Sequence, residues 1–234
     1  MPEPVAFDAR LFDANLRVLE VGSPQAAARI RSAGEVSGVE FVRAADGGLA
    51  AVYRLGGDVL QMSSLYSPID EGRSLADAVD YTTTGAVFVV GFGVGHHVRA
   101  MAERIRRTGV LFVYEPDVAL MRGVLGRVDC REWLGATNLV LMLAPDSGSV
   151  SREVQGYEGV IASGTKVIEH PASRRRLLSS SGEFLATLAS AIGSIRTHVV
   201  TALCQVTTTM SNLAHNAWAY AKAEGIAELK GAAA

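Results

Sequence analysis

Cysteine is scarce in this sequence, and its two copies follow no metal-binding or disulfide spacing. Cys130 and Cys204 are the only cysteines in the 234 residues, and they lie far apart without a CxxC pair. A disulfide framework and a cysteine-ligated zinc site both need several cysteines, so we expect neither. A reducing compartment is the simpler interpretation, and the protein is expected to be cytoplasmic.

Long apolar runs and a strong excess of one charge are also missing. Apolar runs such as 86–90 are far too short to span a bilayer, and the N-terminal residues lack the pattern of a secretory signal. The formal net charge at pH 7 is -2, which argues against a general nucleic-acid binder or a membrane-surface protein. We therefore expect neither a nucleic-acid nor a membrane partner.

Helical and strand patterns are mixed in residues 1–84. Apolar residues in 7–20 recur at helical spacing, and Ser23-Pro24 suits the start of a second helix. Two β-prone runs flank Asp46-Gly47-Gly48, which predicts a hairpin. With a further short helix starting near Asp70, this part is expected to form a small α+β segment.

Strand-like and helical patterns alternate in residues 85–172. Apolar strands are expected at 86–90, 110–117 and 138–143, with a possible fourth at 165–171; helical patterns cover 96–107 and 118–128. This alternation predicts an α/β fold, a Rossmann-like, mainly parallel sheet with helical crossovers.

The last segment, 173–234, has no strong helix breakers apart from single glycines. It predicts a helical tail of two or three helices, since threonines at 207–209 lower helix propensity without forbidding a helix. The expected domains are therefore 1–84, 85–172 and 173–234.

A glycine turn in VFVVGFGVGHHVRAM is the best candidate for a binding site. Gly91, Gly93 and Gly95 lie between a predicted strand and a predicted helix. Glycine there permits positive φ and close approach of a ligand, and the helix N-terminus favours an anion. The dinucleotide fingerprint GxGxxG would need glycine where His96 stands, so a nicotinamide site fits poorly.

An acidic residue follows the glycine turn at the sequence spacing expected for an acid that binds a ribose. Glu115 ends the next strand, twenty residues after Gly95, where an acid can hydrogen-bond a ribose hydroxyl. The adjacent His96 and His97 lack the i, i+4 spacing at which two histidines of a helix bind one metal ion. We expect one of them, with His97 as the candidate, to contact a bound anion, and the other to lie in solvent. The alternative is an empty turn with a solvent-facing carboxylate.

Two other polar features fit ordinary structural roles. Asp146 follows the third strand, where a ligand-facing loop would be expected, but an ordinary turn aspartate is the favoured interpretation. The arginines at 174–176 could meet an acidic partner, and a solvated helix face is favoured over that. No GxSxG, HExxH, Walker A or paired-cysteine zinc pattern is present. The sequence alone therefore identifies no catalytic residue, no metal ion and no definite cofactor.

Several stretches together resemble one family. VFVVGFGVGHHVRAM followed by VLFVYEPDVALMRGVL is similar to the N-terminal region of the motility-associated factor (motility accessory factor) glycosyltransferases. LYSPIDEGRSL resembles that family's Ser-x-Tyr-Asp-Pro-x-x-Glu-Ala segment, matching at Tyr66, Pro68 and Glu71, with Ser67 in place of its aspartate. KVIEHPAS and SNLAHNAWAYAKAEGIAELKG resemble later stretches of that region, in the same order.

The resemblance implies a cytoplasmic bacterial enzyme that glycosylates flagellin, the protein of the bacterial flagellum. Such proteins transfer nonulosonic (sialic-acid-like) sugars from CMP-sugar donors to serine or threonine of flagellin. The family's central domain opens with a Gly-Pro-Ser-Leu loop that this sequence lacks. The resemblance thus implies an N-terminal binding or accessory domain, with flagellin and a nucleotide or nucleotide-sugar as partners.

Two other functions fit the same residues. GxGxG with Glu115 is also the arrangement of a methyltransferase that uses S-adenosylmethionine. A non-catalytic interaction module with an empty glycine turn is the third possibility.

Overall fold

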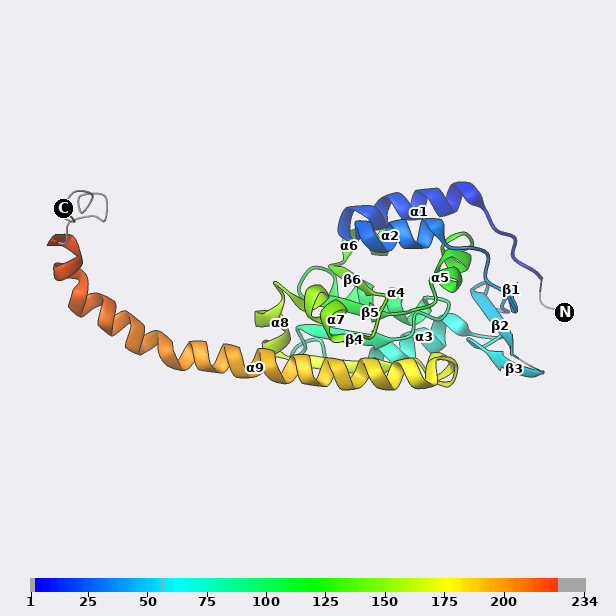
Figure 1. Cartoon of the computed structure of the whole chain (residues 1–234). Coiled ribbons are helices and arrows are strands. Elements are labelled where there is room, and N and C mark those ends of the chain that lie inside the picture. Colours follow the sequence, from blue (N-terminus) through cyan, green and yellow to red (C-terminus); the bar gives the residue numbers. More distant parts are fainter. Residues whose placement is uncertain (1–2, 56, 223–234) are drawn as a thin grey trace, which may run out of the picture.

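The computed structural model describes residues 3–55 and 57–222 (Figure 1). The strands in these residues are β1 (Val39–Arg43), β2 (Leu49–Leu55), β3 (Asp58–Gln61), β4 (Ala86–Val90), β5 (Val110–Tyr114), β6 (Leu139–Met142) and β7 (Thr165–Glu169). The helices are α1 (Ala9–Gly22), α2 (Pro24–Ser32), α3 (Pro68–Asp77), α4 (His96–Ile105), α5 (Val118–Leu125), α6 (Arg131–Ala136), α7 (Ser147–Val154), α8 (Glu158–Ser163) and α9 (Pro171–Lys222).

A four-stranded parallel sheet forms the centre of the molecule. Its strands lie in the order β6-β5-β4-β7, and each neighbouring pair is parallel. Strands β4 and β5 are buried along their whole length, because helices cover both faces of the sheet. The predicted Rossmann-like parallel sheet is confirmed, including its fourth strand.

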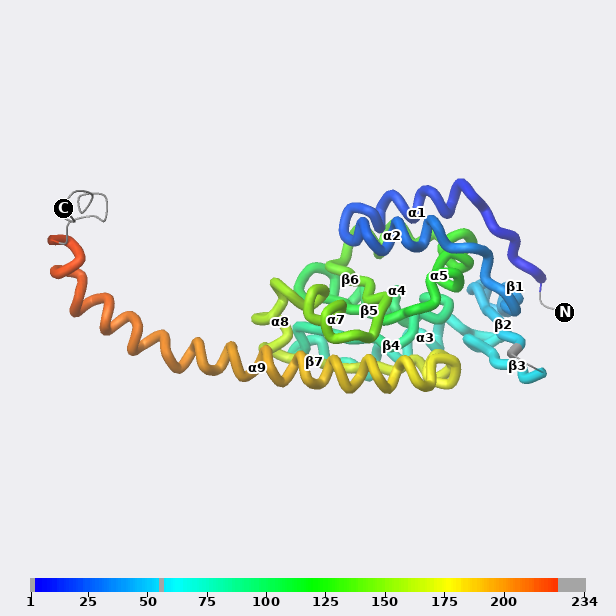
Figure 2. Tube along the Cα trace, viewed as in Figure 1, coloured from blue at the N-terminus to red at the C-terminus, as the bar shows by residue number. Residues whose placement is uncertain are grey.

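Alternate residues of these strands contribute to two separate cores. Val87, Leu111 and Leu139 face a core shared with α1, α2, α4, α5 and α6. Phe88, Phe112 and Val140 face a second core shared with α7, α8 and α9, in which the Phe88 and Phe112 rings stack. Figure 2 shows α1 and α2 on one side of the sheet and α9 on the other. The first core thus unites the N-terminal helices with the sheet.

A small antiparallel sheet, in the order β1-β2-β3, lies beside the parallel one. The predicted hairpin is confirmed: β1 pairs with β2, and the turn between them contains Asp46 and Gly47. Strand β3 was not predicted, because four residues carry little alternation. Helix α3, expected near Asp70, packs on α4, where Gly72 lies so close that an added Cβ would be 2.7 Å from the carbonyl carbon of His96.

Helix α9 is one continuous helix in the described residues, so the prediction of two or three helices is wrong there. Its single glycines and the threonines at 207–209 each cost only a fraction of a kcal/mol to about 1 kcal/mol, too little to end a helix. Its first part packs on the sheet through residues such as Leu177 and Phe184. The rest of the expected tail, 223–234, lies outside the described residues.

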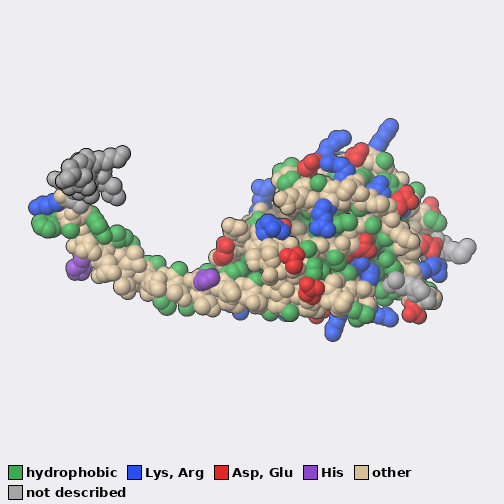
Figure 3. Space-filling view, viewed as in Figure 1, with side chains coloured by type: hydrophobic (Ala, Val, Ile, Leu, Met, Phe, Trp, Pro, Cys, Tyr) green, Lys and Arg blue, Asp and Glu red, His purple; other side chains and the backbone are tan. Residues whose placement is uncertain are grey.

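The second part of α9 projects away from the body of the protein (Figure 1). All residues from 200 to 222 are exposed, among them Leu203, Met210, Leu213 and Trp218. Figure 3 shows hydrophobic side chains along the projecting helix. No described helix combines the length and the apolarity that crossing a membrane requires.

Candidate functional site

The glycine turn has the backbone geometry that its sequence predicts. Gly91, Gly93 and Gly95 have φ values of 97°, 54° and 89°, all in the left-handed region that disfavours other residues. The turn joins β4 to α4 at the carboxyl edge of the sheet, next to β7. In this strand order, the crevice between β4 and β7 is where a Rossmann-type ligand usually binds.

The start of α9 closes that crevice. A Cβ on Gly91 would lie 2.0 Å from the Cβ of Ser173, and a Cβ on Gly93 would lie 2.8 Å from Cε1 of His170. His170 and Ser173 are both buried, and the backbone N–H of His170 donates to the carbonyl of Val90. These close approaches involve the chain itself, so the glycines at 91 and 93 serve the packing of α9.

The two adjacent histidines are held by the protein, and the expectation that one lies in solvent is wrong. Nε2 of His97 donates to the carbonyl of Gly91 at 2.9 Å, and its ring stacks on His170 with centroids 4.4 Å apart. Nε2 of the partly buried His96 donates to the carbonyl of Leu49 at 2.8 Å. His97 is 2% exposed, so the structure leaves it no room to contact an anion without opening.

The stacked histidines predict a loss of stability in mild acid. Burial lowers the pKa of His97 to about 4 and that of His170 to about 2. The unfolded rings take up protons below about pH 6.5 and the folded rings do not, so acidification from there to about pH 5 should cost roughly 2 kcal/mol per ring. Urea unfolding at several pH values measures this loss. An NMR titration in which the folded His97 ring gains a proton near pH 6.5 would contradict it.

Glu115 lies at the end of β5, as expected, and forms a buried ion pair with α9. The Glu115 side chain has no exposed surface, and Nη2 of Arg176 lies 2.6 and 2.7 Å from its two oxygens. The carboxylate also accepts from the backbone N–H groups of Phe92 and Asp117, both at 3.1 Å. Burial raises the pKa of this carboxyl, and Arg176 opposes the rise.

This ion pair leaves Glu115 no room to bind a ribose. Both oxygens already accept hydrogen bonds, and Arg176 also donates to Asp117 at 3.1 Å. The expectations of a ribose contact and of a solvent-facing carboxylate therefore both differ from what the structure shows. Arg176 is 6% exposed, so the expected solvated face at 174–176 is wrong at this position.

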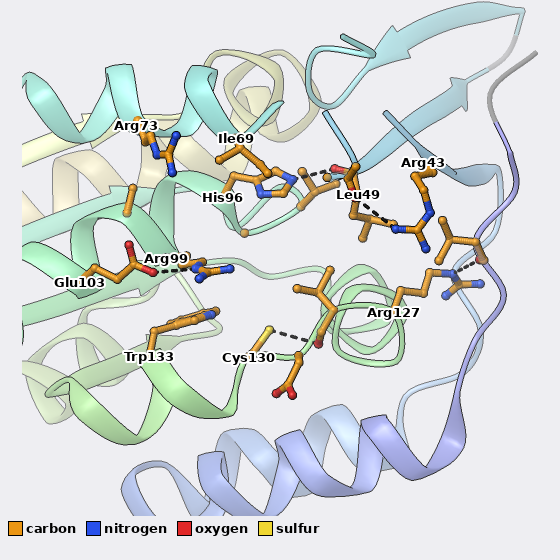
Figure 4. A pocket seen from close by; sticks show the side chains of 18 residues that line it. Arg43, Leu49, Ile69, Arg73, His96, Arg99, Glu103, Arg127, Cys130 and Trp133 are labelled. Carbon is orange, nitrogen blue, oxygen red and sulfur yellow. Dashed lines mark hydrogen bonds and ion pairs between the residues drawn. The ribbon is translucent and has the colours of Figure 1, made fainter. Parts of the chain in front are cut away.

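A cavity of about 480 Å³ opens on the other side of the glycine turn, and we call it the arginine cavity. Gly95 and the start of α4 line one wall. The remaining walls are formed by the β1–β2 turn, α3, the 127–130 loop and Trp133 of α6 (Figure 4). Of the residues predicted from sequence as a binding site, only Gly95 lies in this cavity.

Positive charge predominates around the arginine cavity. Four arginines and two carboxylates line it: Arg43, Arg73, Arg99, Arg127, Glu103 and Asp129. Burial lowers the pKa of His96, so this ring adds no charge at neutral pH. Arg127 is fixed by the carbonyls of Val5 and Gly123. The lining therefore favours an anion.

Other chemistry-bearing residues have structural roles. Cys130 lines the cavity but is 1% exposed, and burial raises the pKa of its thiol to about 12, so it is no nucleophile at neutral pH. Asp146 caps α7 by accepting from the N–H of Ser149 at 2.9 Å, as an ordinary turn aspartate would. Within 3–55 and 57–222, no cluster of three or more histidines, cysteines or acids is placed to hold a metal ion.

Comparison with known proteins finds a similarity of fold to a solved glycosyltransferase structure. No protein-family model and no curated protein sequence matches the chain. Among solved structures, the MAf glycosyltransferase from Magnetospirillum magneticum AMB-1 is similar, with a TM-score of 0.51 and 14% sequence identity. The match covers 81% of this chain and 35% of the glycosyltransferase chain. The chain thus shares its fold with about a third of that protein, which confirms the resemblance at the level of fold.

Proposed function

We propose that this chain is a binding or accessory domain of a cytoplasmic protein glycosyltransferase of the motility-associated factor type. The whole enzyme would transfer a nonulosonic sugar from a CMP-sugar to serine or threonine of flagellin. The observation that carries the proposal is the similarity of fold to the MAf glycosyltransferase over 81% of the chain. The positively charged arginine cavity supports a nucleotide or nucleotide-sugar as the ligand.

The methyltransferase alternative is opposed by the geometry of the glycine turn. S-adenosylmethionine would need the crevice above Gly91 and Gly93 together with a free acid at Glu115. His170 and Ser173 occupy that crevice, and Arg176 occupies the acid. An interaction module is the second candidate, and the apolar side chains exposed on the projecting part of α9 favour it.

Calorimetry and a pull-down test these functions together. The purified chain is titrated with CMP, a CMP-sugar and S-adenosylmethionine, and it is also mixed with unmodified flagellin. We expect the cytidine compounds to bind and flagellin to be retained. Tight binding of S-adenosylmethionine alone would exclude the glycosyltransferase role. Retention of flagellin without any small-molecule binding would favour the interaction module.

A further inference from the structure

The arginine cavity contains cationic side chains that are only loosely engaged. Arg43 donates to the carbonyl of Gly47 and pairs with no carboxylate in the described part of the chain. Arg99 pairs with Glu103, and Arg73 pairs with Asp70, but in each pair both side chains are about half exposed or more. Exposed pairs of this kind are weak and exchange readily. These guanidinium groups are therefore able to turn towards an incoming anion.

The floor of the cavity holds a hydrogen-bond donor without a partner. Trp133 is 3% exposed, and no acceptor in the described residues lies within hydrogen-bonding distance of its Nε1. Figure 4 shows the indole below Arg99, with Cys130 beside it. A buried N–H group without an acceptor is unfavourable and rare in folded proteins. An acceptor on a ligand that reached this atom would satisfy it.

Size and surroundings narrow the class of ligand. A volume of about 480 Å³ suits a small metabolite and is too small for a folded partner. Val94, Ala100 and Val128 supply apolar lining next to the arginines. The site therefore combines contacts for an anionic group with an apolar region that has one hydrogen-bond donor. Guanidinium groups match the geometry of phosphate oxygens, which they bind through paired hydrogen bonds.

We propose that the arginine cavity binds a phosphate ester. Its phosphate oxygens accept from Arg43 and Arg99, and an acceptor on its organic part takes the N–H of Trp133. This assignment gives the chemical class of ligand for the accessory role proposed above. It rests on that role only for the choice of a cytidine compound as the probe. The site lies apart from the crevice between β4 and β7, which the start of α9 fills.

Tryptophan fluorescence can report on the cavity directly. The chain has two tryptophans, and Trp218 is 70% exposed on α9. In the Trp218→Phe variant, all tryptophan emission comes from Trp133. This variant is titrated with CMP, with pyrophosphate and with uncharged cytidine. We expect CMP to shift or quench the emission with saturation, pyrophosphate to compete, and cytidine to bind far more weakly.

Substitutions in the Trp218→Phe background locate the ligand. Arg43→Gln and Arg99→Gln should each weaken CMP binding about tenfold, as expected for the loss of one charge-assisted hydrogen bond. The matched control is Arg54→Gln, an exposed arginine that pairs with Glu40 outside the cavity, and its affinity should not change. Trp133→Phe, measured by calorimetry, should also weaken binding while keeping the aromatic packing.

Three results would overturn the assignment: no binding of CMP or pyrophosphate at millimolar concentration, equal binding of CMP and cytidine, or full affinity in both arginine variants. Each substitution is checked by circular dichroism, so a loss of fold is not mistaken for a loss of binding. The proposed glycosyltransferase role fails separately. If the variants weaken CMP and pyrophosphate as expected but flagellin is not retained, the cavity assignment stands without that role.

Discussion

Replacing Arg176 with methionine is expected to lower the free energy of unfolding by about 3–5 kcal/mol, since the change leaves a buried carboxylate without its cation. Glu115 has no exposed surface, and Arg176 contacts both of its oxygens. Urea unfolding followed by circular dichroism measures the effect. The control is Arg174→Met, which removes an exposed arginine 3.7 Å from Glu169 and should cost less than about 0.5 kcal/mol.

The Arg176→Met variant should also acquire a characteristic pH dependence. Without Arg176, only burial and two backbone N–H groups act on Glu115, so the pKa of this carboxyl rises further. A raised pKa in the folded state gives stability at low pH that is lost as the pH increases through that pKa. The difference from the parent protein should therefore shrink on acidification. Adding Glu115→Gln should restore part of the loss. A loss below about 1 kcal/mol at neutral pH would contradict the role of this pair.

Gly91→Ala is expected to be the second most damaging change, with a loss of about 2–5 kcal/mol from left-handed strain and overpacking together. The new methyl group would lie 2.0 Å from the Cβ of Ser173, at a φ of 97°. The control is Gly156→Ala, where φ is 86° and no atom lies within 4 Å of an added Cβ. That control should show the strain alone, about 1–2 kcal/mol.

A compensating change tests whether the clash with Ser173 causes this loss. Ser173→Gly removes the Cβ and Oγ atoms that the new methyl group would meet. The double variant with Gly91→Ala and Ser173→Gly should therefore be more stable than Gly91→Ala alone, as measured by urea unfolding. If the double variant is less stable than the single one, the start of α9 does not close the crevice as described.

The central sheet could be predicted because its signals are local. Each parallel strand is a short apolar run, and runs such as 86–90 and 110–114 stand between glycines or polar residues. The positive φ values of the glycines at 91, 93 and 95 could be predicted, because a strand that turns sharply into a helix favours residues without a Cβ. The hairpin around Asp46 was equally clear.

The site could not be predicted, because its contacts join distant segments. Glu115 has the spacing of a ribose ligand, but its partner Arg176 lies 61 residues later in a run that resembles a solvated helix face. Once a strand-end acid and a helix arginine are both known to be near the sheet, a buried pair is a reasonable hypothesis. The lining of the arginine cavity extends from Val5 to Trp133, and no local pattern brings these residues together.

Hydrogen exchange with and without CMP tests most directly whether the ligand binds in the arginine cavity or in the crevice between β4 and β7. We predict that saturating CMP slows exchange in peptides covering 43–49, 95–100 and 127–133, which line the cavity, and leaves 170–176 unchanged. Protection of 91–93 together with altered exchange at 170–176 would contradict this account, because the crevice beneath α9 would then be the binding site.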